Sequence, residues 1–156
     1  MTEIEDIQRE LADARADLLD ALAGVSQAEI DRRPAGEITD DEQRWPIVEV
    51  LWHIGVTEDR FRRTIDQAMD EREVTTDAPR TRPPHMTTPP LLLEWLDQTR
   101  RPTEALLRRM TATDLAIEIP RPDGSTRTPA RFLAILAGHD RQHAQQVRDL
   151  RALVDA

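Results

Sequence analysis

The chain has 156 residues, a formal net charge of −9 and no cysteine, and all 21 of its basic residues are arginine. This length suits one domain, 1–156, with its own hydrophobic core. The acidic balance argues against nucleic acid as a partner, because sequence-independent binding needs a basic face. Without cysteine the chain has no disulfide, no thiolate metal ligand and no thiol nucleophile, so any sulfur chemistry must arrive with the substrate.

Aromatic residues make up only 3% of the chain. The core must therefore consist mainly of leucine, isoleucine, valine and alanine, which favours packed helices. No run of about 18 apolar residues is present to cross a bilayer. The first ten residues, "MTEIEDIQRE", are acidic and amphipathic, unlike the basic and then apolar start of a signal peptide. We therefore expect a cytoplasmic protein with no membrane partner.

Apolar residues recur at helical spacing in four stretches of the chain. The first predicted helix runs from 3 to 23, and Gly24 after it offers a stop. The second opens at Pro46 and continues to about residue 71. The third begins after Thr88, a predicted N-cap, and contains Pro102, which should kink or split it.

The fourth predicted helix opens at Thr128 and Pro129 and runs nearly to the end of the chain. The proline- and threonine-rich stretch 75–90, between the second and third helices, is long enough to cross the molecule. Alternating apolar residues before Asp123-Gly124 predict a short turn or hairpin. The sequence thus predicts an all-α four-helix bundle, with a long crossover between helices two and three and a small turn or hairpin before helix four.

Two of the four histidines, His139 and His143, stand four residues apart in the fourth predicted helix, and so on one helix face. That face is the apolar one, because the predicted inward positions are Phe132, Leu136, His139, His143, Val147, Leu150 and Val154. Two core imidazoles hydrogen-bonded to neighbours are one interpretation. Unpaired ring nitrogens cost free energy when buried, and a shared divalent cation would satisfy both rings at once.

His53 in the second predicted helix is the candidate third ligand. At about 100° per residue it lies roughly 120° from the centre of that helix's apolar stripe, at the edge of the core. Three histidines with no sulfur ligand leave room for water, which is the arrangement of a reactive zinc site and not of a purely structural one. His85, in the proline-rich stretch, is a further candidate for a fourth ligand.

The segments that carry these histidines resemble the signature of the DinB-like family of four-helix bundle proteins. "WPIVEVLWHI" matches the family pattern W-x-x-x-E-x-L-x-H-I, and "HDRQH" matches H-D-x-x-H. The order of the elements fits over nearly the whole chain. The resemblance implies a divalent metal ion, often zinc or nickel, held by His53, His139 and His143. It also implies frequent homodimers, and activities such as thiol-dependent S-transfer or the metal-binding part of mycothiol-dependent maleylpyruvate isomerases.

Several further residues are candidates for the site or for the interior. Glu49 stands one turn before His53, so it would orient that imidazole or act as a base, unless it is simply a solvated helix charge. Thr57 and Arg60 share this edge and would line a pocket for an anionic substrate. Glu58 falls inside the apolar stripe, which predicts an arginine partner or a pocket wall. The remaining expectations are a surface position for Asp140 and packing roles for Trp45 and Trp52.

The preferred function is a metal-dependent enzyme that activates a thiol or water, with a low-molecular-weight thiol as co-substrate and a small molecule as substrate. Metal-dependent hydrolysis is the nearest alternative. The third hypothesis is non-catalytic, a metal-stabilised dimeric stress or binding protein. An accessible pocket beside the metal would favour an enzyme, whereas a fourth protein ligand in sealed surroundings would favour a structural role.

Overall fold

In a computed structural model of the protein, residues 1–34, 42–73 and 81–153 are described. Their elements, in chain order, are α1 (Glu3–Ala21), α2 (Gln27–Asp31), the 3₁₀ helix η1 (Glu42–Arg44), α3 (Ile47–Met69), α4 (Pro89–Arg109), α5 (Ala112–Leu115), β1 (Ile119–Pro120), β2 (Thr126–Arg127) and α6 (Pro129–Arg151). The inward position expected at Val154 lies outside these residues, as do residues 75–80 of the expected crossover.

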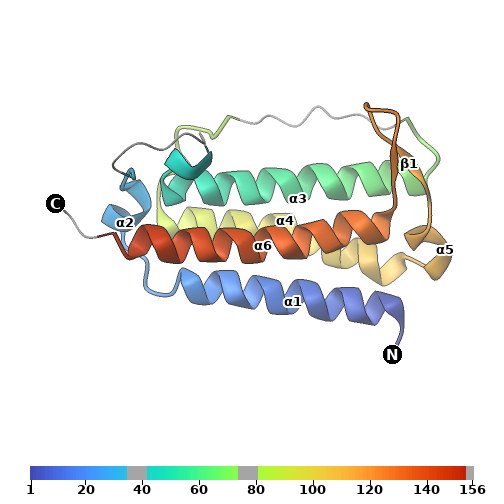
Figure 1. The fold of residues 1–156 in the computed structure, drawn as a ribbon, viewed down its shortest axis with the longest axis horizontal. Helices are drawn as coiled ribbons and strands as arrows, with labels where there is room; N and C mark the ends of the chain where they lie inside the picture. The colour runs from blue at the N-terminus through green and yellow to red at the C-terminus, as the bar shows by residue number, and fades with distance from the viewer. Residues whose placement is uncertain (35–41, 74–80, 154–156) are drawn as a thin grey trace.

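The four long helices, α1, α3, α4 and α6, lie side by side along the length of the molecule (Figure 1). Helix α6 packs mainly on α1 and α3, and α3 packs on α4. Helices α3 and α4 run in the same direction, so the chain leaves α3 at one end of the bundle and enters α4 at the other. This arrangement confirms the all-α four-helix bundle with a long crossover between the second and third long helices.

Short elements account for most of the differences from the prediction. Helix α2 was not predicted, although Ser26 and Glu29 form a reciprocal capping box that marks its start. Helix α4 continues through Pro102 and is not split. Pro102 lies on the exposed face of α4, as does Gln98, whose carbonyl loses its hydrogen-bond donor to the proline.

The predicted hairpin is present but very short. Strands β1 and β2 pair antiparallel, with Ile119 opposite Arg127. Gly124 has a φ of +85°, a conformation that L side chains rarely adopt, and it closes the turn by donating its N–H to the Arg121 carbonyl. The hairpin covers the end of the bundle where α3 finishes and α6 starts (Figure 1).

A close approach between α3 and α4 depends on Gly55. A Cβ at this position would overlap the indole of Trp95. The indole donates a hydrogen bond to the Trp52 carbonyl (3.2 Å) and stacks on the Trp52 ring at a centroid distance of 4.4 Å. This contact fixes the residue that precedes His53, and Trp52 is buried as expected.

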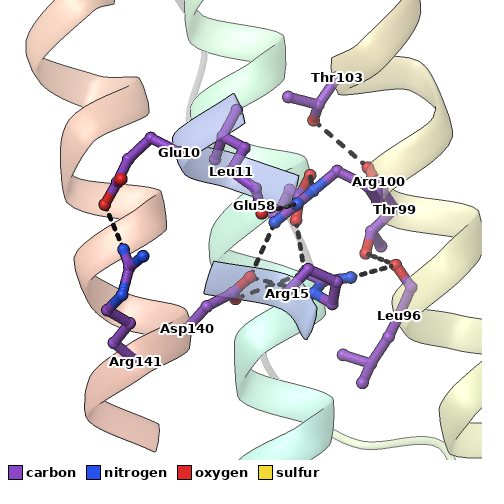
Figure 2. A network of polar contacts seen from close by, with 10 residues as sticks. All are labelled: Glu10, Leu11, Arg15, Glu58, Leu96, Thr99, Arg100, Thr103, Asp140 and Arg141. Atoms are coloured by element: carbon purple, nitrogen blue, oxygen red, sulfur yellow. Dashed lines mark hydrogen bonds and ion pairs between the residues drawn. The ribbon is translucent and has the colours of Figure 1, made fainter. Parts of the chain in front are cut away.

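Each long helix contributes one charged residue to a network in the interior (Figure 2). Arg15 of α1 contacts Glu58 of α3 (Nη2–Oε1 3.0 Å) and Asp140 of α6 (Nε–Oδ2 3.0 Å). Arg100 of α4 contacts the same two carboxylates at 2.8 and 2.9 Å. Burial alone lowers the pKa of Arg100, but Glu58 and Asp140 outweigh this effect and the pKa is raised. The arginine partner expected for Glu58 is therefore present.

The surface position expected for Asp140 is wrong, because this residue is only 2% exposed. Asp140 is buried because Arg15 and Arg100 provide partners for its carboxylate inside the bundle, and the sequence alone did not reveal these two arginines. The remaining donors of the arginines reach backbone carbonyls: Arg15 bonds to Leu96 and Arg100 to Leu11, each at 3.0 Å. The network thus holds all four helices together and fixes α6 next to His139.

Candidate metal centre

The three predicted ligands converge on one point between α3 and α6. His139 Nε2 lies 3.0 Å from His53 Nε2 and 2.9 Å from His143 Nε2. The rings meet edge to face, with centroids 4.3 to 5.3 Å apart. His139 and His143 are one turn apart on α6, and His53 faces them from the first half of α3. The helix spacing and the bundle packing therefore bring together residues that are 86 positions apart.

Gln146 fixes the protonation pattern of His143. Its side-chain nitrogen donates to the Glu42 carbonyl (3.0 Å), so its side-chain oxygen is the atom that lies 2.7 Å from His143 Nδ1. An amide oxygen only accepts hydrogen bonds, so Nδ1 must carry the proton. In the neutral ring, Nε2 then carries a lone pair that points at the other two histidines.

Glu42, on η1, brings a carboxylate to the same point. Its Oε1 lies 3.2 Å from His143 Nε2 and 3.7 Å from His53 Nε2. One ligand atom from each of Glu42, His53, His139 and His143 lies within 4.8 Å of all the others. We call these four residues the histidine cluster.

The histidine cluster disfavours protonated imidazole. Burial and the neighbouring His143 and His53 lower the pKa of His139 to about 3. Burial, His143 and Arg60 also lower the pKa of His53, with Glu42 acting in the opposite direction. His53 and His139 are thus held in the neutral form, which is the form that binds metal ions.

The donor set suits a divalent transition-metal ion. Nitrogens that each lie about 2.0–2.1 Å from one ion are separated by roughly 3 Å, and His139 Nε2 lies at such a distance from the Nε2 atoms of His53 and His143. Imidazole nitrogen and carboxylate oxygen both bind zinc and its neighbours in the periodic table. The buried Nδ1 of His139 has no hydrogen-bond partner among the described residues, so the ring is not held by hydrogen bonds at both nitrogens. The residues therefore fit such an ion.

A pocket of about 280 Å³ opens beside His53 along the flank of α3. Its lining includes Thr57 and Arg60, as the sequence indicated. Trp45 forms one wall and contacts the His53 ring edge to face, at a centroid distance of 5.0 Å. The His53 side chain is 30% exposed, so the histidine cluster is accessible from this side.

Comparisons with other proteins agree with this architecture. Residues 3–147 match the sequence profile of the DinB superfamily. The chain belongs to the DinB superfamily. A solved structure described as a conserved protein from Enterococcus faecalis has the same fold, with a TM-score of 0.69 at 17% identity, over 97% of this chain and 96% of that one. A comparison with curated proteins finds no match.

The other candidates of this DinB-superfamily chain lie outside the histidine cluster. Glu49 lines the pocket, but its carboxylate is engaged by Arg82 (Oε1–Nε 2.7 Å), so its role as a base stays a prediction. His85 is exposed and is not one of the four clustered residues. The residue that the sequence did not reveal is Glu42, which belongs to a short 3₁₀ helix without an apolar pattern. Its one signal was its place in an acidic stretch just before the helix that carries His53.

In the described parts of this chain, no helix has both the length and the apolar character that a bilayer crossing requires.

Proposed function

We propose that the histidine cluster binds a divalent metal ion through His53, His139 and His143, and that the protein is a metal-dependent enzyme acting on a small molecule in the adjoining pocket. A bound divalent ion lowers the pKa of a water or thiol ligand and supplies a nucleophile at neutral pH. The family resemblance favours a thiol and S-transfer, with zinc or nickel as the ion and a homodimer as the assembly. The single observation that carries the proposal is the open pocket against His53.

The residues around the pocket would each have a separate role in metal or substrate binding. Gln146 holds His143 in the tautomer whose Nε2 points at the cluster. Trp45 shields one side of His53 from water. Thr57 and Arg60 offer polar contacts to a substrate further along α3. The chain has no cysteine, so a thiol nucleophile would be the co-substrate's own.

One observation favours the structural alternative. Glu42 is positioned as a fourth protein ligand, as in a closed structural site. Its side chain is 38% exposed, however, and the surroundings of His53 are open and not sealed. We therefore place the enzyme first, with metal-dependent hydrolysis as its nearest variant.

Two measurements test the proposal. Elemental analysis of untagged protein should find a transition metal, and His143→Ala should retain less than about a tenth of it. In cobalt(II)-loaded protein, a small thiol should add a sulfur-to-metal charge-transfer band that saturates with thiol concentration. The matched control is His85→Ala, which removes an exposed histidine outside the cluster and should leave both results unchanged.

Equal metal content in the wild type and His143→Ala would rule out the site. A cobalt spectrum that responds to azide but not to thiol would favour hydrolysis. A spectrum that responds to neither would show that no coordination position is open, and would support the structural role.

A further inference from the structure

A second pocket lies next to the first, between α3 and the β1–β2 hairpin. It has a volume of about 170 Å³ and is lined by Arg60, Phe61, Thr64, Arg121, Arg127 and Phe132, among others. Arg60 and Phe61 come from α3, Arg121 and Arg127 from the hairpin, and Phe132 from the first turn of α6. Three arginines therefore meet at one pocket in a chain whose net charge is −9.

The pocket combines an aromatic floor with cationic walls. Phe61 and Phe132 pack edge to face at a centroid distance of 5.0 Å. The Arg127 guanidinium lies 4.9 Å from the centre of the Phe132 ring, a cation–π contact that holds it in place. A guanidinium fixed over a ring presents its remaining donors in a set direction, which suits the two oxygens of a carboxylate.

The positive charge of Arg127 is only partly compensated by its neighbours. Burial and the neighbouring Arg121 and Arg131 lower the pKa of Arg127, and Asp123 acts in the opposite direction. Asp123 is exposed, and its carboxylate accepts hydrogen bonds from the backbone and hydroxyl of Ser125. No acidic residue is among the described residues that line the pocket.

Arg60 connects this pocket with the histidine cluster, because it lines both pockets and lowers the pKa of His53. His53, Thr57, Arg60 and Thr64 follow one another at steps of three and four, so they form one stripe along α3. From His53 to Arg60 the helix rises by about 10 Å. A ligand anchored at the arginines would therefore reach the cluster only if it were elongated.

We propose that Arg60, Arg121 and Arg127 bind the carboxylate group of an elongated small molecule with an apolar body. The apolar part nearest the anionic group packs on Phe61 and Phe132. The other end of the molecule extends along α3 toward His53. Only this last step rests on the proposed function, because the arginine pocket needs no metal ion.

The anion site is tested on metal-free protein by titration calorimetry with 3-phenylpropionate, the neutral 3-phenylpropionamide and inorganic phosphate. The carboxylate should bind, and the amide should bind at least about tenfold more weakly, because it makes no charge-assisted hydrogen bonds. Phosphate should also bind more weakly than 3-phenylpropionate, since it has no apolar body. Equal binding of the acid and the amide, or tighter binding of phosphate, would overturn the proposal.

Two variants locate the site. Arg127→Gln should weaken 3-phenylpropionate binding about tenfold, and Arg127→Lys, which keeps the charge and the fold but loses the planar fork, should also weaken it. The control is Arg131→Gln, which removes the same charge from an exposed neighbour outside the pocket lining. If the Arg131 variant weakens binding as much as the Arg127 variants, the ligand responds only to the overall positive charge of this region. The assignment of the binding site to Arg127 would then be wrong.

The reach toward His53 is tested separately in cobalt(II)-loaded protein. The thiolate band of 8-mercaptooctanoate should saturate at a lower concentration than that of 3-mercaptopropionate, and Arg127→Lys should remove this advantage. Absence of the advantage, with 3-phenylpropionate binding intact, would overturn the extension toward His53 and leave the anion site in place. The metal content of Arg127→Lys should equal that of the wild type, which separates these results from a failure of the metal site.

Discussion

Two polar groups of residues lie inside the same bundle, and they differ in how their charges are balanced. The network of Arg15, Glu58, Arg100 and Asp140 pairs two cations with two anions, and each arginine also reaches a backbone carbonyl. The histidine cluster instead brings three imidazole nitrogens and a carboxylate together, and none of its four residues is an arginine or a lysine.

The difference separates a structural centre from a binding site. Buried charges are tolerated when they are paired and hydrogen-bonded, and the four-residue network meets that condition within the chain. The four residues of the histidine cluster include no arginine or lysine, and a bound metal ion would supply a positive charge among them. Asp140 and His139 are neighbours on α6, so the complete network holds the backbone of the incomplete cluster.

The largest expected effect comes from breaking the network. Asp140→Ala leaves two buried guanidinium groups with only one carboxylate of the network, Glu58, between them, and it should lower the free energy of unfolding by about 3–5 kcal/mol. Urea unfolding of the metal-free protein at pH 7 measures this loss. The control is Arg141→Ala at the next position, which removes an exposed ion pair with Glu10 (Figure 2) and should change stability by no more than about 0.5 kcal/mol. Equal losses in the two variants would show that the network does not hold the helices together.

Breaking the histidine cluster should have the opposite effect, a large loss of metal affinity with a small loss of stability. His139→Ala should reduce metal affinity more than about a hundredfold, since it removes the ring that contacts both other imidazoles. It should cost the metal-free protein less than about 1 kcal/mol, because it also removes a buried Nδ1 without a partner among the described residues, and this offsets the lost packing. Competition with a metal indicator measures the metal affinity, and urea unfolding measures the free energy of unfolding. A large loss of stability without loss of metal would reverse the roles assigned to the two groups.

The pH dependence of stability should also distinguish the histidine cluster from the charged network. The pKa of His139 is lowered from 6.5 to about 3, so between these values the unfolded chain binds a proton that the folded metal-free protein does not. Stability should therefore fall as the pH drops below about 6.5, at a rate approaching tenfold in the folding equilibrium constant per pH unit.

His139→Ala should lose this component, whereas titration of the carboxylates in the network is common to both proteins and cancels in the comparison. Urea unfolding between pH 7 and pH 4, with a chelator present, measures the difference. Parallel stability curves for the two proteins would contradict the shifted pKa.

Most of the fold could be predicted from local sequence patterns, because tertiary contacts do not change the secondary structure that these patterns indicate. The apolar stripes predicted the four long helices, and the Asp-Gly turn predicted the hairpin, because each signal lies within one element. The extent of the hairpin was less predictable. The alternating apolar residues before Asp123-Gly124 are Leu115, Ile117 and Ile119, but Leu115 belongs to α5 and only Ile119 lies in a strand. The capping box at Ser26 was present in the sequence, but five residues do not give a helical period.

The candidate site was predictable where each signal lies within a single helix. His139 and His143 follow from their spacing on α6, and His53 from its place at the edge of a stripe. Asp140 and Arg100 meet across the bundle, and Arg121 and Arg127 meet Arg60 only because the hairpin folds over α3. Such contacts depend on how the helices are rotated against one another, which no local pattern determines.

The smallest effect compares two carboxylates that precede His53. Glu49 matches the family pattern, yet Arg82 engages it, whereas Glu42 has no place in the pattern but lies 3.2 Å from His143 Nε2. Glu42→Gln keeps the size of the side chain and removes the charge, and it should weaken metal binding by about tenfold or less, because the three histidines hold the ion and the partly exposed carboxylate contributes mainly its charge. Glu49→Gln should change metal affinity less than twofold and serves as the matched control. Competition with a metal indicator at pH 7 measures both variants, and a larger effect from Glu49→Gln would return the role of charged partner to the residue that the sequence indicated.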